Sequence, residues 1–290
     1  MNTGIATTAD AIVGITESAG HRYYRRFGAP ERVMHAFLML SFVGCALTGL
    51  PLIFSTQKWA ALLAGLLGGS QGAAVIHRVC ASVMLTVFAT HLALLVRRAV
   101  TTGDWKSMVW GPDSLVPQPQ DAIDLWSNLK WFVGRGPRPT FDRWTYWEKF
   151  DYWAVFWGMA IIGGSGLLLW FPVFFSKFAP GILFNIASLV HGEEALLAVG
   201  FIFTFHFFNG HLRPEKFPMD TVVFTGRIPE HELQGERAVH YRRLAGAGAL
   251  AAQVAPAPTR ESLVFGWFVG GTALVLGVVA IVLIIYSVVF

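Results

Sequence analysis

Charged residues are scarce in this sequence of 290 residues, since Asp, Glu, Lys and Arg together make up only 14% of it. Soluble domains usually carry about 25% charged residues. Hydrophobic residues make up 54%, and the mean hydropathy is +0.52. This composition excludes an ordinary soluble globular protein and predicts several membrane spans.

Cysteine is nearly absent, and the two that occur, Cys45 and Cys80, lie within apolar stretches, where we expect packing residues and no disulfide. No C-x-x-C-H motif occurs, which excludes a covalently attached c-type haem. No phosphate-binding loop, nucleophile constellation or cysteine metal motif is present. The net charge of +4 follows the loops and forms no single patch, so we expect no nucleic-acid binding.

Five apolar stretches are each long enough to cross a bilayer as a helix. They are residues 33–54, 73–96, 152–175, 181–209 and 263–290. Two shorter apolar segments, 59–67 and 178–184, are too brief to cross and are expected to lie along the membrane surface. A faint repeat relates 46–51 to 164–172, so the first four spans are predicted to form two helical hairpins.

Lys and Arg alternate between the connecting segments. Four precede the first span, eight lie in 97–149 and seven in 213–260, whereas the two remaining loops hold one each. Because cytoplasmic loops carry the excess of Lys and Arg, we expect a cytoplasmic N-terminus and a C-terminus outside a bacterial inner membrane. The first 30 residues lack the apolar core of a cleavable signal peptide.

Two of the spans each carry a pair of histidines. His77 and His91 are fourteen residues apart, and His191 and His206 are fifteen apart. At about 100° per residue, both members of each pair face one side of their helix. Ionisable side chains inside a span are costly and are functional candidates. The second and fourth spans both run from the outside to the inside. His77 and His191 therefore share the outer level, and His91 and His206 share the inner level.

Facing imidazoles at two depths predict two stacked b-type haems, bound without covalent links. The outer iron is expected between His77 and His191. The inner iron needs His206 and one partner, for which His35 in the first span competes with His91. Spacing alone does not choose between these two.

Seven short motifs lie in and beside the first four spans, at residues 31–37, 48–50, 75–78, 146–149, 169–172, 190–192 and 205–206. They resemble motifs of the cytochrome b (gamma) subunits of respiratory formate dehydrogenases and of the related thiosulfate reductases and NiFe hydrogenases. The resemblance covers roughly residues 30–210 and implies an all-α integral membrane fold, a four-helix diheme cytochrome b bundle, here with a fifth C-terminal transmembrane helix.

The family pairing, carried over, implies that His35 with His206 holds the inner haem and His77 with His191 the outer one. This sequence departs from the family pattern in two ways. The family has no ligand at the position of His91, and its two histidines in the fourth span are fourteen residues apart, whereas here they are fifteen apart. A pairing of His91 with His206 is similar to that in the cytochrome b of quinol–cytochrome c reductases. The histidine that is not used is expected beside the quinone or a haem edge.

The resemblance also implies partners. They are menaquinone or ubiquinone near the inner haem, and a redox subunit of the iron–sulfur or multihaem c-type. His211 and Arg213 follow the fourth span and are candidates for a haem propionate or the quinone. Glu193 and Glu194 are read either as acceptors for a ligating histidine or as solvated carboxylates. The loop 101–143 is expected to dock a partner or cap the inner haem.

The sequence thus predicts a membrane cytochrome b subunit of a respiratory complex that carries electrons between its partner and the quinone pool. The alternative is a proton or ion transporter without haem that uses the intramembrane histidines. His21, His231 and His240 are expected to be solvated. The predicted domains are a cytoplasmic segment (1–30), the diheme domain (31–210), a cytoplasmic segment and linker (211–262) and the fifth span (263–290).

Overall fold

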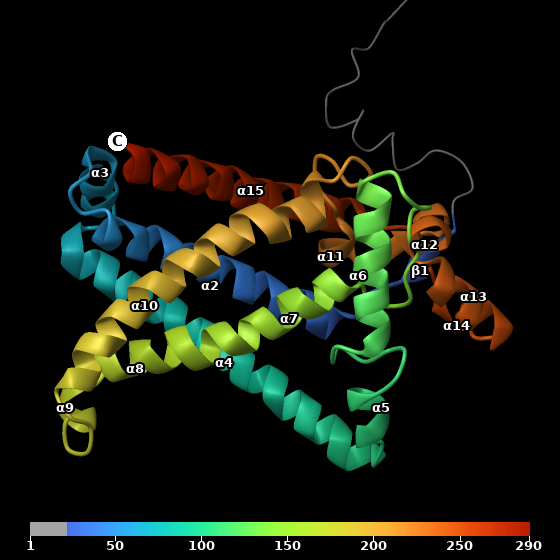
Figure 1. Cartoon of the computed structure of the whole chain (residues 1–290), viewed down its shortest axis with the longest axis horizontal. Helices are drawn as coiled ribbons and strands as arrows, with labels where there is room; N and C mark the ends of the chain where they lie inside the picture. Colours follow the sequence, from blue (N-terminus) through green and yellow to red (C-terminus); the bar gives the residue numbers. More distant parts are fainter. Residues whose placement is uncertain (1–21) are drawn as a thin grey trace, which may run out of the picture.

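A computed structural model describes residues 22–290 of the chain. Five helices in it are long and apolar enough to cross a membrane, which confirms the prediction of a helical, multi-pass membrane protein. They run lengthwise through the molecule (Figure 1). The five are α2 (Ala29–Ile53), α4 (Gly69–Thr102), the third span (Tyr146–Trp170), the fourth span (Ile182–Leu212) and α15 (Arg260–Val289).

The third and fourth spans are interrupted by π-helical turns, in which each hydrogen bond skips one residue more than in an α-helix. Such turns insert a residue without breaking the helix. The third span comprises α7 (Tyr146–Gly158), the π-helix η1 (Met159–Gly163) and α8 (Gly164–Trp170). The fourth comprises α10 (Ile182–Phe201) and the π-helices η2 (Ile202–His206) and η3 (Phe208–Leu212).

Short helices occupy the turns at one end of the bundle. Helix α3 (Lys58–Leu66) joins α2 to α4, in agreement with the prediction that this segment does not cross. The third span ends before Pro172, although the sequence predicts that it runs to residue 175, because proline has no N–H to continue the helix. Pro172 instead starts the short helix α9 (Pro172–Phe175).

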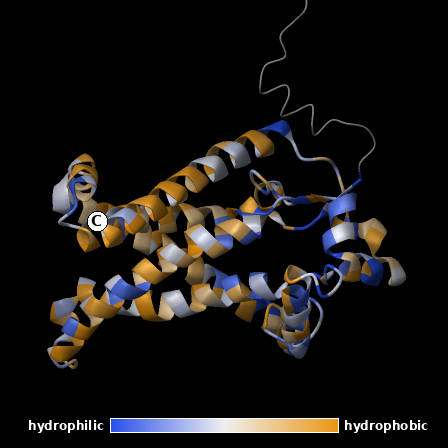
Figure 2. Ribbon diagram, turned by 45° about the horizontal axis from the view of Figure 1, so that its top comes forward, coloured by the Kyte–Doolittle hydropathy of each residue, from blue (hydrophilic) through white to orange (hydrophobic). Residues whose placement is uncertain are grey.

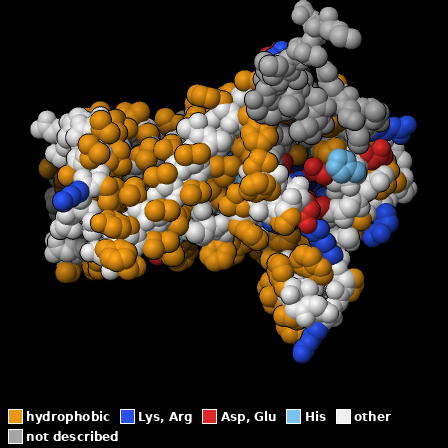
Figure 3. Space-filling view, turned by 90° about the horizontal axis from the view of Figure 1, so that it is seen from above, with side chains coloured by type: hydrophobic (Ala, Val, Ile, Leu, Met, Phe, Trp, Pro, Cys, Tyr) orange, Lys and Arg blue, Asp and Glu red, His pale blue; other side chains and the backbone are white. Residues whose placement is uncertain are grey.

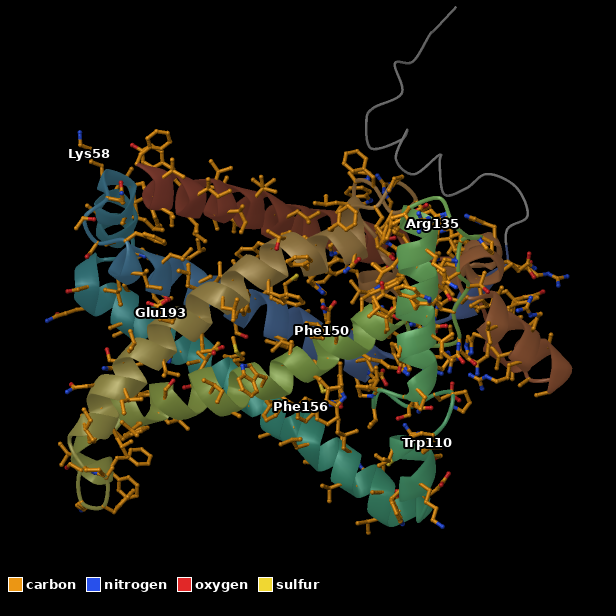
Figure 4. All side chains as sticks on the ribbon, in the orientation of Figure 1. Lys58, Trp110, Arg135, Phe150, Phe156 and Glu193 are labelled. Atoms are coloured by element: carbon orange, nitrogen blue, oxygen red, sulfur yellow. The ribbon has the colours of Figure 1, made fainter. Side chains whose placement is uncertain are left out.

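The connecting segments 22–28, 103–145 and 213–259 meet at the other end, which we call the basic end. Figure 2 shows hydrophilic residues concentrated there, and Figure 3 shows apolar side chains over the helical body, as a lipid-facing surface requires. The helices of the basic end are α5 (Trp105–Val109), α6 (Pro119–Phe132), α11 (Val222–Thr225), α12 (Glu230–Glu236), α13 (Ala238–Gly246) and α14 (Leu250–Gln253). Lys58 and Arg135 mark the two ends in Figure 4.

A small antiparallel sheet closes the basic end. Strand β1 (Tyr23–Arg25) lies between β2 (Arg227–Pro229) and β3 (Val254–Ala255). The sequence predicts a linker after the fourth span, whereas the structure has these strands and four short helices. Strands of two or three residues are too short for an alternating pattern to reveal them.

The start of α7 anchors the basic end. Glu148 accepts hydrogen bonds from Arg237 at 2.7 and 2.9 Å and from Arg26 at 3.2 Å. The neighbouring Lys149 binds Asp121 of α6 at 2.8 Å. The third span is therefore tied to the segments before the first span, after the second and after the fourth.

Helix α15 packs one face against its own bundle. Its small residues allow this close approach, because a Cβ at Gly277 would overlap the rings of Phe203 and Phe207. Similarly, a Cβ at Gly270 would lie 2.8 Å from the ring of Phe224. The fifth span thus supports the segment that carries His206.

Candidate functional site

His77 of α4 and His191 of α10 face each other inside the bundle. Their ring centres are 6.1 Å apart, and the ring planes are inclined by 69°. Two imidazoles that share one metal ion, each with a metal–nitrogen bond of about 2.0 Å, have ring centres roughly 6 Å apart. The two rings are therefore already at the separation that a single iron requires.

The hydrogen bonds of His77 fix its tautomer. Its Nδ1 lies 2.8 Å from Thr48 Oγ1, and that hydroxyl donates its own hydrogen to the carbonyl oxygen of Gly44 at 2.7 Å. The hydroxyl is thus left to accept, so Nδ1–H of His77 donates to it. In a neutral imidazole this leaves the lone pair on Nε2 available to a metal.

His191 is held in the same way from the third span. Its Nδ1 lies 3.0 Å from the carbonyl oxygen of Ile162 and 3.3 Å from Ser165 Oγ. A carbonyl can only accept, so Nδ1–H donates and the Nε2 lone pair is again available. Ile162 belongs to η1, and π-helical turns are frequent at functional sites.

A glycine follows each hydroxyl residue and lies against the same ring. A Cβ at Gly49 would be 3.7 Å from Cε1 of His77, and one at Gly166 would be 3.0 Å from Cε1 of His191. These residues occupy the related positions of the internal repeat, Thr48-Gly49 and Ser165-Gly166. The repeat therefore supplies each histidine with a hydrogen-bond acceptor and with space beside the ring.

A second group of histidines lies nearer the basic end. His206 in η2 has its Nδ1 2.9 Å from Asp151 Oδ2 and its ring centre 6.4 Å from that of His211. His35 of α2 lies near both of these histidines. We call His35, His206 and His211 the inner cluster.

His91 has different neighbours. Its Nε2 lies 2.9 Å from the hydroxyl of Tyr152, and its ring centre is 6.3 Å from that of Phe156. Asp151 and Tyr152 are consecutive residues of α7, so their side chains point about 100° apart. Since the first contacts His206 and the second contacts His91, these two histidines lie against different sides of α7.

The spacing of fifteen residues in the fourth span has a structural explanation. The π-helix η2 lies between His191 and His206 and accommodates one extra residue. In a regular α-helix, fifteen residues would leave His206 about 60° from the direction of His191. With one residue taken up by the π-helical turn, the rotation is that of fourteen residues, about 40° short of a full turn, as for His77 and His91.

The remaining candidates are bound within the protein. His211 Nδ1 accepts the backbone N–H of Asp220 at 3.2 Å. Arg213 pairs with Glu236 at 2.5 Å, so its charge is already balanced. Glu193 is exposed, as labelled on α10 in Figure 4, and Glu194 accepts a hydrogen bond from the indole of Trp157 at 3.3 Å.

Sequence reasoning missed some of these contacts. Asp151 lies one residue before the predicted start of the third span and was not considered. His240 was expected to be solvated, but it is only 8% exposed and lies 3.3 Å from Asp142. His231 is exposed, and His21 lies outside the described residues.

No family model matches the chain. The chain is similar to the cytochrome b556 subunit of a formate dehydrogenase of Escherichia coli, with 23% identity over 175 residues. The match covers 60% of this chain and 72% of that subunit, and the same subunit from two other strains of the species gives the same values. This distant relationship and the five apolar helices support a respiratory cytochrome b of the membrane that takes part in electron transport.

Proposed function

We propose that the chain is the membrane subunit of a respiratory oxidoreductase complex and binds two b-type haems. It carries electrons through them between a partner redox subunit and a quinone. The observation that carries the proposal is the 6.1 Å separation of the rings of His77 and His191, both with Nε2 available. Among residues 22–290, no three His, Cys, Asp or Glu side chains lie close enough to hold a bare metal ion. Two imidazoles suit an iron whose other positions belong to a porphyrin.

The outer haem would be held by His77 and His191. A groove of about 450 Å³ lies on the surface between Trp170 of α8 and α4, but neither His77 nor His191 lines it. The guanidinium of Arg78 lies 5.7 Å over the ring of Trp170 at this groove. The assignment of the outer haem therefore rests on the two rings and their hydrogen bonds.

The inner haem would be held by His35 and His206. In support, His35 lies near His206, whereas His91 is engaged with Tyr152 on another side of α7. His91 is then outside the ligand set.

A bound haem supplies one-electron chemistry at each level. The chain's own residues orient the ligands, through Thr48 and Ser165 at the outer level and Asp151 at the inner level. Two sites at different depths allow electrons to cross an apolar layer that charged carriers do not enter.

We place the quinone, menaquinone or ubiquinone, near the inner cluster, where protons reach it from the adjacent aqueous phase. His211 lies beside His206 and has one ring nitrogen left to bind a quinone carbonyl. Arg213 stabilises the basic end through Glu236 and is not assigned to a propionate.

The basic end would be cytoplasmic, because it gathers the segments rich in Lys and Arg. The C-terminus lies at the opposite end, as Figure 1 shows, and would be outside a bacterial inner membrane. Residues 31–210 then form the diheme domain, which α15 supports. The partner would be an iron–sulfur or multihaem c-type subunit.

Purified full-length protein tests the proposal through its reduced-minus-oxidised spectrum and its haem content. We expect a b-type alpha band and two haems per chain, with one haem lost in His77→Ala and in His191→Ala. The exposed His231→Ala serves as the control and keeps both. A wild-type protein without a chromophore would contradict the proposal and favour the alternative, a proton or ion transporter whose histidines relay protons.

A further inference from the structure

The inner ligand His206 is bound to a carboxylate. Asp151 Oδ2 lies 2.9 Å from its Nδ1, and the side chains of His206 and Asp151 are only 28% and 18% exposed. A carboxylate can only accept a hydrogen bond, so Nδ1–H of His206 donates to it. The Nε2 atom of His206 therefore carries the lone pair that would bind iron.

The outer ligands have neutral partners instead. His77 donates to the hydroxyl of Thr48, and His191 donates to the carbonyl of Ile162 beside the hydroxyl of Ser165. The partners of the outer ligands thus carry no charge, whereas the partner of His206 carries a negative charge.

This difference affects the stability of oxidised iron. A carboxylate that accepts from the second nitrogen of a ligating imidazole makes that imidazole a more basic ligand. A more basic ligand stabilises ferric iron more than ferrous iron, because ferric iron carries the larger positive charge. The charge of the carboxylate acts in the same direction through space, and more strongly in a partly buried site than in water.

We propose that Asp151 lowers the reduction potential of the inner haem through His206, an assignment that rests on the proposed function. Asp151 is a positioning residue, since it acts on the iron through its ligand. Its effect favours the movement of an electron from the inner level to the outer level. Compared with a site whose ligand has a neutral partner, the inner haem is then a weaker acceptor of electrons from a quinol and a stronger donor of electrons to the outer haem.

The experiment is a spectroscopic redox titration of the purified full-length protein and of Asp151→Asn. Asparagine keeps an acceptor oxygen of similar position but removes the charge. We expect both haems to remain and one midpoint potential to rise, with at least a tenfold change in the equilibrium between ferric and ferrous forms. For a one-electron couple, tenfold corresponds to about 59 mV. The same substitution in His77→Ala protein, which keeps the inner haem alone, assigns the shift to that haem.

Two further variants separate charge from packing. Asp151→Glu keeps a carboxylate, and we expect its potentials to stay near those of the wild type. Asp124→Asn removes a carboxylate of α6 that binds Gln120, and we expect no shift. The inference is overturned if both potentials of Asp151→Asn are unchanged, if Asp151→Glu raises the potential as much, or if Asp151→Asn loses the inner haem. Each of these outcomes leaves two haems in the wild-type protein, whereas a wild type without haem overturns the proposed function itself.

Discussion

Thr48 and Ser165 hold two histidines of different helices in matching ways. The Thr48 hydroxyl lies 2.8 Å from Nδ1 of His77, and the Ser165 hydroxyl lies 3.3 Å from Nδ1 of His191. Each hydroxyl also donates to a backbone carbonyl of its own helix, at 2.7 Å and 2.6 Å. Both rings are therefore oriented by the helix that faces them.

The hydroxyl of Thr48 is the first target for a test. Thr48→Val keeps the shape of the side chain but leaves Nδ1–H of His77 without this partner. An unsatisfied buried donor costs about 1–3 kcal/mol, so we expect the affinity for the outer haem to fall by roughly tenfold or more. Haem titration of the apoprotein measures this. Thr86→Val is the matched control, since the hydroxyl of Thr86 binds its own helix at the carbonyl of Ser82. An unchanged affinity in Thr48→Val would show that the hydroxyl does not orient the ligand.

The glycine beside His191 offers a second test. A methyl group at Gly166 would lie 3.0 Å from Cε1 of that ring, so Gly166→Ala forces the imidazole to shift. We expect a lower content of the outer haem. Gly164→Ala is the matched control two residues away, because no heavy atom lies within 4 Å of its added Cβ. Equal haem content in the two variants would argue against a close fit at this ring.

The partner of His206 can be identified by removing each candidate. We expect His35→Ala to lose the inner haem, because His35 lies near His206, and His91→Ala to keep both haems. Haem content per chain and the shape of the alpha band report the result. The opposite outcome would assign the inner iron to His91 and would require it to leave the hydroxyl of Tyr152.

The basic end is expected to open on acidification. Burial alone would raise the pKa of Asp142, but hydrogen bonds from His240 and Arg243 hold that pKa well below its usual range. The pKa of an Asp carboxyl is about 3.9 in the unfolded chain and lower here in the folded protein. The ionised carboxyl therefore stabilises the fold above about pH 3.9, and this stabilisation is lost as the pH falls toward the pKa of the folded state. The protection of residues 227–255 against hydrogen exchange, relative to the intrinsic exchange rate at the same pH, should therefore fall below about pH 4. In Asp142→Asn we expect faster exchange already at pH 7 and a weaker pH dependence; wild-type-like exchange at pH 7 would contradict this.

Packing of the fifth span is testable with two glycines. A side chain at Gly277 would meet Phe203 and Phe207, so Gly277→Val should separate α15 from the fourth span, at a cost of about 1–3 kcal/mol. Gly271→Val is the control, since its added Cβ has no neighbour within 4 Å. Thermal unfolding in detergent compares them, and equal midpoints would show that α15 is not packed as described.

The five spans could be predicted because about 20 consecutive apolar residues are enough to identify each of them. The pairing of His206 could not, since spacing gives the depth of a histidine but not which helix stands next to it. That information lies in α7, where Asp151 contacts His206 and the adjacent Tyr152 contacts His91.

The sheet and the π-helices escaped prediction for other reasons. The pairing of Tyr24 with Ile228 joins residues about two hundred positions apart, and no local pattern encodes it. A π-helical turn leaves no mark in composition, although the spacing of fifteen residues between the histidines of the fourth span was its indirect sign.

The small sheet also has a consequence for the assembly of the protein in the cell. Its central strand, Tyr23–Arg25, is synthesised before any span, whereas its two partners, Arg227–Pro229 and Val254–Ala255, emerge only after four spans have been made. The first strand must therefore wait at the membrane surface until the fourth helix has been inserted in the correct direction. A chain with one span missing or inverted would leave the strands on opposite sides of the membrane, where they could not pair.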